Sequence, residues 1–117
     1  MKKVLFAILL SVFCLTGAYA ESKDAIFDRL YNGTVAQLPP GVTAGKSADY
    51  RIMFINYPLE ISSRSGFDVI AAKRAIVNVI RNTVDADYIR RSDAMIIYNY
   101  ITTDRKVYSV VITDADL

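Results

Sequence analysis

Between Ser65 and Val84, in the middle of the chain, apolar residues recur at the spacing of an amphipathic helix. Two adjacent rows lie along one side of this predicted helix: Val69, Ile76 and Ile80, and beside them Ile70, Val77 and Val84. The opposite side carries Arg74, Asn78, Arg81 and Asn82. An apolar stripe of this width is typical of a helix that covers a sheet. Ser65, with Asp68 three residues later, provides a capping signal for the first turn.

Lys73 falls inside the apolar stripe. One reading is a lysine whose stem packs against the sheet while its ammonium group reaches water. The other is a functional lysine whose pKa is lowered by its surroundings.

The pattern before the central helix predicts a helix, a loop and a strand. Residues 21–33 are predicted as a short helix that begins at Ser22 as N-cap and ends at Asn32-Gly33. Residues 34–48 contain Pro39-Pro40 and are predicted as the longest loop. Residues 50–57 are rich in β-forming, mostly apolar residues and are predicted as the first strand.

The pattern after the central helix predicts a β-hairpin of residues 94–101 and 106–113. One side of the hairpin carries Ile96, Tyr98, Tyr100, Tyr108, Val110 and Ile112. The other side carries Met95, Ile97, Ile101, Val107 and Val111, interrupted by Asn99 and Ser109. The central helix must cover one of these two sides.

The order of these elements predicts an α+β fold with a short N-terminal helix followed by β-α-β-β. The helix that joins the first and second strands is a crossover, which makes those strands parallel. The third strand is uncharged and the most apolar, so at an edge it would invite aggregation. We therefore expect a three-stranded mixed sheet in the order 1-3-2, with the helices on one face. The opposite face, carrying several tyrosines, is expected to stay partly open.

Residues 1–20 have the features of a cleaved signal peptide. Lys2 and Lys3 precede an apolar run that is too short to span a bilayer, and Ala18-Tyr19-Ala20 forms a cleavage site. Residues 21–117 are then a single domain without a transmembrane helix, exported to the periplasm or, as an alternative, secreted. The formal charge of +2 comes from the two signal lysines, so this domain is neutral. A neutral domain argues against a nucleic-acid binder.

Composition also removes most catalytic chemistries. The chain has no histidine, and its one cysteine, Cys14, leaves with the signal peptide. This excludes the usual zinc sites, thiol nucleophiles and imidazole bases, and leaves a disulfide-free domain. Asp85 and Asp87 are expected to open a short second helical turn, with their carboxylates at its positive end. They do not start a calcium loop, because Ile89 and Arg90 occupy the positions of a ligand and of the glycine. We expect no enzyme activity, no cofactor and no metal.

The candidate partner-binding residues fall in two groups. Tyr98, Tyr100 and Tyr108 form the first, because their rings would lie on the open sheet face. Pro40, Thr43 and Lys46 form the second, because a long exposed loop is a common contact surface. At the level of fold alone, the β-α-β-β core resembles small ring-building and periplasmic adaptor domains of secretion and pilus machines.

We therefore expect a non-catalytic accessory or adaptor protein of the bacterial envelope. It would bind another exported or outer-membrane protein by the open sheet face or by strand addition at an edge. One alternative is an enzyme inhibitor or immunity-type protein that inserts a rigid loop of residues 38–47 into an active site. Another is a small-ligand binder or carboxylate hydrolase, which requires a concave pocket near Lys73 or Asp85.

Overall fold

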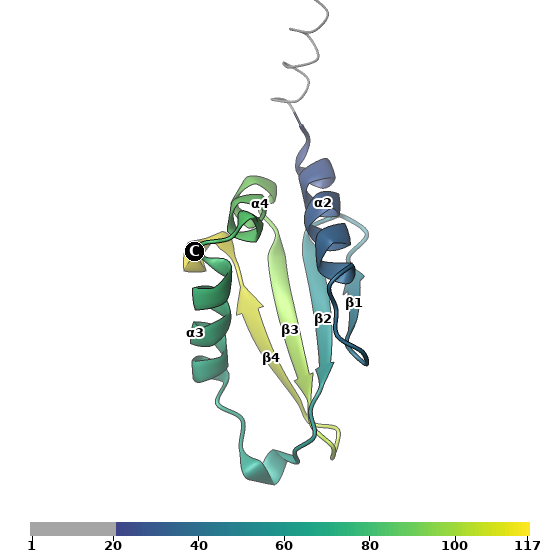
Figure 1. The fold of residues 1–117 in the computed structure, drawn as a ribbon, viewed down its shortest axis with the longest axis vertical. Coiled ribbons are helices and arrows are strands. Elements are labelled where there is room, and N and C mark those ends of the chain that lie inside the picture. Colours follow the sequence, from purple (N-terminus) through teal and green to yellow (C-terminus); the bar gives the residue numbers. More distant parts are fainter. Residues whose placement is uncertain (1–20) are drawn as a thin grey trace, which may run out of the picture.

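Residues 21–117, which the computed structural model describes, form a four-stranded mixed sheet with three α-helices on one face (Figure 1). The elements in chain order are α2 (Lys23–Val35), β1 (Thr43–Lys46), β2 (Ile52–Pro58), the 3-10 turn η1 (Ser63–Ser65), α3 (Val69–Ile80), α4 (Val84–Ser92), β3 (Met95–Ile101), β4 (Val107–Ile112) and the 3-10 turn η2 (Asp114–Asp116). The predicted α+β class is confirmed. The predicted signal peptide lies outside the described residues.

Both α2 and α3 begin after a residue whose side chain caps the first turn, but the cap of α3 is not the predicted one. Ser22 caps α2 as predicted, and its hydroxyl accepts a hydrogen bond from the Ala25 backbone N–H at 3.1 Å. The cap of α3 is Asp68, which accepts from the Ala71 N–H at 3.0 Å, and Ser65 lies in η1 instead. Gly66 separates the two with a φ of 81°, a conformation that breaks a helical path.

The helix ends also differ from the prediction. The first helix continues past Asn32-Gly33 to Val35. The central helix ends at Ile80 instead of Val84. The second helical turn expected at Asp85 and Asp87 is a separate nine-residue helix, α4, that begins at Val84. Asp85 and Asp87 lie in its first turn, where the helix dipole favours acidic residues.

The predicted strand order 1-3-2 is wrong. The crossover makes β2 and β3 parallel as expected, but they are direct neighbours, and β4 pairs only with β3 at the sheet edge. The β2–β3 ladder is continuous from the pair Ile52–Met95 to the pair Pro58–Ile101. Because β3 pairs with β2 on one edge and with β4 on the other, β3 takes the interior position that was expected for β4.

The predicted loop 34–48 contains a fourth strand, β1, which pairs antiparallel with β2. The turn between them is held by Ser47, whose backbone N–H donates to the Ile52 carbonyl at 2.8 Å. The Ser47 hydroxyl donates to the Asp49 carboxylate at 2.6 Å. Tyr50 completes the turn with a φ of 58°. Four residues with a central Gly45 show no β pattern, so the strand exists because β2 offers it a free edge.

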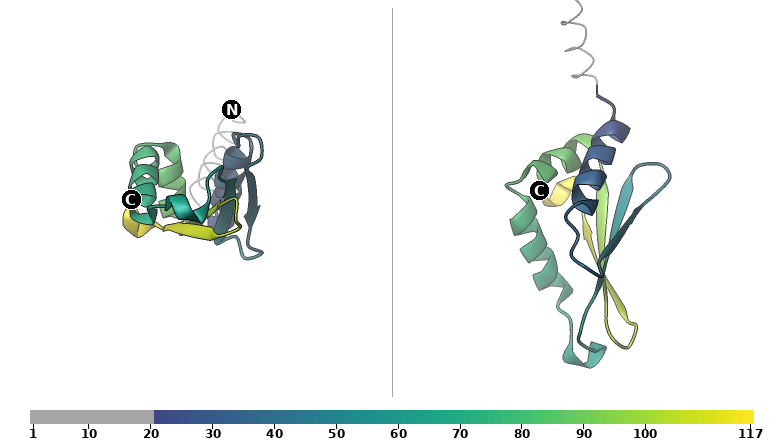
Figure 2. Two further views of the ribbon diagram at one scale, coloured as in Figure 1. Left: turned by 90° about the horizontal axis from the view of Figure 1, so that it is seen from below. Right: turned by 45° about the vertical axis from the view of Figure 1, so that its right-hand side comes forward.

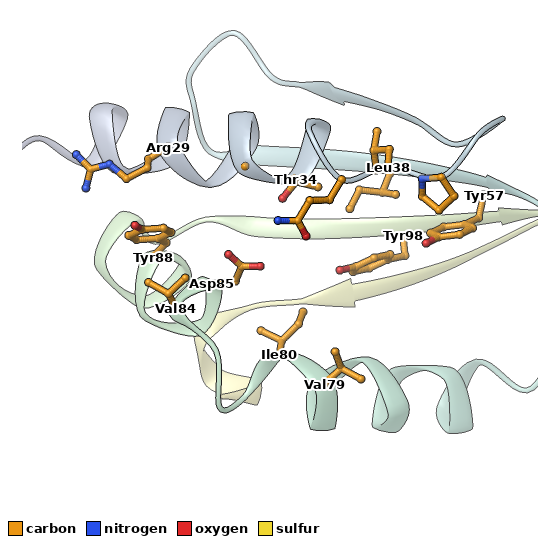
Figure 3. A pocket seen from close by; sticks show the side chains of 14 residues that line it. Arg29, Thr34, Leu38, Tyr57, Val79, Ile80, Val84, Asp85, Tyr88 and Tyr98 are labelled. Atoms are coloured by element: carbon orange, nitrogen blue, oxygen red, sulfur yellow. The ribbon is translucent and has the colours of Figure 1, made fainter.

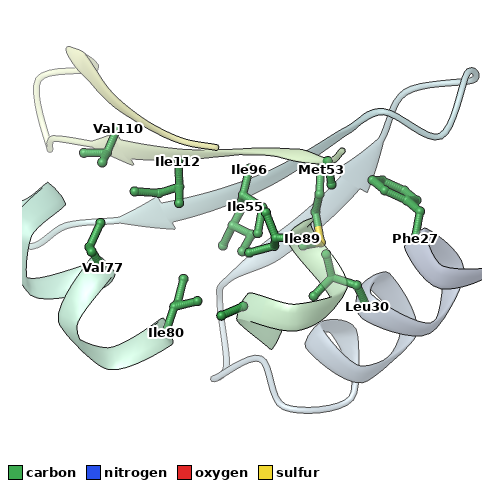
Figure 4. Packing of buried hydrophobic residues seen from close by; sticks show 12 residues of the cluster. Phe27, Leu30, Met53, Ile55, Val77, Ile80, Ile89, Ile96, Val110 and Ile112 are labelled. Carbon is green, nitrogen blue, oxygen red and sulfur yellow. The ribbon is translucent and has the colours of Figure 1, made fainter. Parts of the chain in front are cut away.

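The hydrophobic core lies between the sheet and the helices, which share one side in both views of Figure 2. In Figure 4, Ile89 of α4 lies between Leu30 of α2 and the β2 and β3 residues Ile55 and Ile96. At the other end of the core, Val77 of α3 points toward the β4 strand. No helix within residues 21–117 is long and apolar enough to cross a membrane.

Candidate binding surfaces

The three predicted tyrosines lie on the helix face of the sheet, so the expectation that they mark the open face is wrong. Tyr98 and Tyr100 share their side of β3 with Ile96, which is buried in the core, and strand alternation fixes all three together. Tyr108 is the β4 partner of Tyr100. Because the core residues decide which side of the hairpin faces the helices, the tyrosines follow them.

An aromatic cluster occupies the end of this face that α3 leaves uncovered. Tyr57 stacks on Tyr100 at 5.5 Å between ring centroids. Phe67, from the residues before α3, lies 4.8 Å from Tyr100 and 5.3 Å from Tyr108. Phe67 thus connects the start of α3 to the sheet, which gives Tyr108 a packing role.

A cavity of about 540 Å³ lies between α2 with residues 37–39 on one side and α3 with α4 on the other (Figure 3). Tyr57 of β2 and Tyr98 of β3 form its floor (Figure 3), and Ile55 of β2 also lines it. A second hollow of about 230 Å³ shares Tyr57 and Tyr98 with it and adds Tyr100. We call these two hollows together the tyrosine groove. Its volume lies in the range of small-molecule sites, roughly 300–1,000 Å³.

One carboxylate faces this groove without a counter-ion. Asp85 points into the cavity from α4 (Figure 3), and no basic side chain within residues 21–117 forms an ion pair with it. Burial raises the pKa of the Asp85 carboxyl. Arg29, at one end of the cavity, is held by Glu21 and lies over the Tyr88 ring. The groove therefore combines an aromatic floor with one uncompensated negative group.

The phenols on the floor are neutral groups. Burial raises the pKa of Tyr98, with smaller contributions from Tyr100, Tyr57 and Asp85. Burial likewise raises the pKa of Tyr100. Among the described residues that line the groove, Asp85 alone carries a carboxylate, so no carboxylate pair for glycoside-type hydrolysis is assembled there.

The loop residues of the predicted site do not join the tyrosines in one surface. Pro40 is exposed beside Pro39, which lines the groove. Lys46 forms an ion pair with Asp28 at 3.0 Å and lies over the rings of Tyr31 and Tyr50. The hydrogen bond to Asp28 raises the pKa of Lys46. Lys46 therefore ties β1 to α2.

Lys73 also forms an ion pair between two segments of the fold. Its ammonium group lies 3.1 Å from the Asp116 carboxylate at the C-terminal end, and its side chain is partly exposed. This contact is consistent with the reading in which the stem packs and the charge stays at the surface.

Thr43 lies on the other side of the sheet, which none of the helices within residues 21–117 covers and which we call the open face. There, one polar row crosses all four strands. Asn56 donates to Thr43 at 3.3 Å, Asn99 donates to Asn56 at 3.0 Å, and Ser109 donates to Asn99 at 2.7 Å. Each of these side chains has at least one hydrogen-bond partner within the row, which lowers the cost of burying the row against another protein.

Apolar rows flank the polar row. Phe54, Ile97 and Val111 lie on one side of it, and Pro58, Ile101 and Val107 on the other. Val107 is 56% exposed and Val111 is 38% exposed. No side chain that β1 to β4 present on the open face carries a charge. Sequence reasoning missed this surface, although its signal, the matched Asn99 and Ser109, was visible as an interruption of the apolar pattern.

No cluster of three or more metal-ligating side chains occurs in the part of the chain that the structure describes. Comparison of the chain with protein-family models, with curated proteins and with solved structures gave no match.

Proposed function

We propose that this chain is a non-catalytic, exported accessory protein that binds another protein of the bacterial envelope through its open face. The observation that carries the proposal is this uncharged, partly exposed sheet surface, with apolar rows on both sides of the row from Thr43 to Ser109. Large exposed apolar patches mark interaction sites, and the centres of protein interfaces are depleted of charge.

The surface defines the chemistry of the partner. A matching partner presents apolar side chains to Phe54, Ile97 and Val111, and amide or hydroxyl groups to the polar row. A component of a secretion or pilus machine fits the export signal predicted in residues 1–20. The absence of histidine, and of cysteine beyond the predicted signal, supports binding over catalysis.

In-cell photo-crosslinking tests this proposal. A photo-reactive residue is placed at Thr43 or Val111 on the open face, at Tyr98 in the groove, and at Arg90 on the exposed side of α4 as a control. The first two positions should yield the same dominant protein by mass spectrometry, and Arg90 should not. Crosslinks to Tyr98 alone, or none to another protein, would contradict the proposal.

A pair of matched substitutions separates binding from folding. Val111 and Val35 have similar exposures, 38% and 42%, but Val35 lies on α2. Val111→Glu should abolish capture of the crosslinked partner while Val35→Glu leaves it intact, with equal thermal unfolding of both variants. Equal capture by the two would show that the open face is not the interface.

The tyrosine groove favours a second candidate function, a small-ligand binder. Aromatic rings and a lone carboxylate suit an apolar compound with an ammonium group, since cations bind favourably over aromatic faces. The test compares 2-phenylethylamine with uncharged 2-phenylethanol by calorimetry. Tighter binding of the amine, abolished by Asp85→Asn, would support the groove as a ligand site, and equal binding would exclude a role for Asp85.

The hypothesis of an enzyme inhibitor receives less support from the structure. It required a projecting rigid loop of residues 38–47, but residues 43–46 of that segment are the β1 strand, paired with β2.

A further inference from the structure

The outer edge of β4 lacks the sequence features that block pairing at a strand edge, although α3 packs against the helix face of this strand (Figure 1). β4 is the last strand of the sheet and pairs with β3 alone. Its residues Val107–Ile112 include no charge and no proline, and its register with β3 runs without a bulge. Charges, prolines and bulges are the devices by which natural sheets block further pairing at an edge.

The hydrogen-bond pattern identifies the free backbone groups. The Thr102 N–H donates to the Lys106 carbonyl at 2.8 Å, so this pair is a hydrogen-bonded pair of the antiparallel ladder. Alternation along the ladder then turns the backbone of Tyr108, Val110 and Ile112 toward β3. The N–H and C=O groups of Val107, Ser109 and Val111 point to the outer edge.

These outward groups are self-complementary. If a second β4 lies antiparallel with Ser109 opposite Ser109, Val107 of each copy faces Val111 of the other. Each facing pair then exchanges two N–H···O bonds. On the open face, valine meets valine and serine meets serine, so the polar row and the apolar rows continue from one copy into the next.

The charges at the two ends of β4 are complementary in the same register. Arg105 and Lys106 precede the strand, and Asp114 follows it. All three are exposed, and none forms an ion pair within residues 21–117. In the antiparallel arrangement Lys106 lies opposite Ile112 of the second copy and diagonal to its Asp114. The two-fold axis produces this favourable contact twice, and opposite charges across strands stabilise pairing.

Two features of the chain limit this pairing to two copies. The Thr113 N–H, the next outward donor after Val111, is already bound to the Asp116 carboxylate at 2.9 Å. Asp116 in turn is held by Lys73. The opposite sheet edge, β1, is only four residues long and includes Lys46. The pairing therefore closes on itself and does not propagate into a fibre.

We infer that β4 pairs antiparallel with β4 of a second copy across a two-fold axis at Ser109, forming a dimer with one continuous sheet. The dimer joins two open faces into a single surface. It does not depend on the proposed function, because it requires only the purified protein.

Charge reversal with rescue tests the inference. Sedimentation of the purified protein should show a dimer, and Lys106→Glu or Asp114→Lys should each weaken the dimer at least tenfold, because each creates like-charge contacts. The double variant exchanges the two charges and should restore the dimer. Arg64→Glu, at an exposed residue of η1, makes the same charge change away from β4 and should have no effect.

A disulfide trap supplies a second measurement. Facing residues of a hydrogen-bonded antiparallel pair have Cα atoms about 5.5 Å apart, a separation that a disulfide spans. Ser109→Cys should crosslink two copies rapidly under mild oxidation, whereas Ser65→Cys, exposed in η1, should not.

Three outcomes would overturn the inference. The first is a wild-type protein that remains monomeric at about 100 µM, a concentration at which even weak specific dimers are populated. The second is a dimer unaffected by both charge reversals. The third is a dimer disrupted by Phe54→Glu but not by charge reversal, which would place the second copy on the open face.

Discussion

Replacing Ile89 by alanine tests the arrangement of the core most directly. Ile89 lies on α4 and its side chain is fully buried, at 0% exposure. In Figure 4 it points between Leu30 of α2 and the β2 residues Met53 and Ile55. Through this contact α4 connects α2 to the sheet. A side chain shortened here leaves a cavity bounded by helices on one side and the sheet on the other.

The loss of stability expected for Ile89→Ala follows from how completely this side chain is enclosed. Isoleucine-to-alanine substitutions in cores cost about 2–5 kcal/mol, and the cost rises when the surroundings cannot collapse. Because Ile89 is enclosed by three elements, we expect a loss of about 3–4 kcal/mol. A domain of this size is stable by about 5–15 kcal/mol, so the variant should still fold. Its Tm should fall by roughly 12–32 °C.

Thermal and urea unfolding followed by circular dichroism measure this loss. Ile89→Val should lose only about 1 kcal/mol. Ile70→Ala, at a residue that is 71% exposed on α3, should change stability by less than about 0.5 kcal/mol. A loss below about 1 kcal/mol for Ile89→Ala, or one equal to that of Ile70→Ala, would refute the position of α4 between α2 and the sheet.

Three further predictions concern the charges and the phenols of the fold. Val77→Asp should abolish cooperative unfolding, because Val77 is 8% exposed and an unpaired core carboxylate costs several kcal/mol; a normal transition would show that α3 presents another face. Hydrogen bonds from Ser63 and Thr102 lower the pKa of the Asp104 carboxyl in the folded protein. The ionised carboxylate therefore stabilises the fold above about pH 4, and this stabilisation is lost as the pH falls through the folded pKa. The stability difference between wild type and Asp104→Asn should therefore shrink in acid, and a pH-independent difference in urea unfolding would contradict this. Burial raises the pKa of Tyr98, so stability should fall above about pH 10, and less so in Tyr98→Phe; identical alkaline unfolding of the two proteins would be the negative result.

Local sequence patterns predicted the helices and strands whose own residues show a clear hydrophobic period. The 3.6-residue period correctly predicted that Val77 and Ile80 of α3 are buried, but Ile70 of the same predicted stripe is 71% exposed. Strand alternation predicted the hairpin of β3 and β4 and which of its residues share a side, but not which side faces the helices. The handedness of crossovers predicted that β2 and β3 are parallel. In each case the physical cause acts within one element or between successive elements.

The features that sequence reasoning missed depend on contacts between distant segments. β1 forms because β2 offers a free edge, and its four residues carry no pattern of their own. The sequence named Asp85 as a place for a pocket but could not show the groove, because the groove draws residues from α2, β2, α3, α4 and β3. The choice of sheet face was open in the sequence, but the polar pair Asn99 and Ser109 marked the less buried side of the hairpin.

The error in strand order is informative about β4. The expected order placed this strand in the interior because an uncharged apolar strand at an edge is an aggregation hazard. The structure leaves it at the edge, so the hazard that motivated the prediction still has to be resolved. Beyond the end of the strand, the outward N–H of Thr113 is already bound to the Asp116 carboxylate, but the outward groups of β4 itself have no such partner within residues 21–117. Pairing with a second copy removes the free edge of both chains, satisfies the outward groups of Val107, Ser109 and Val111, and uses the charges of Lys106 and Asp114. The same argument explains why β4 has no gatekeeping charge: a lysine or glutamate at Ser109 would protect the monomer but would face its own copy across the axis.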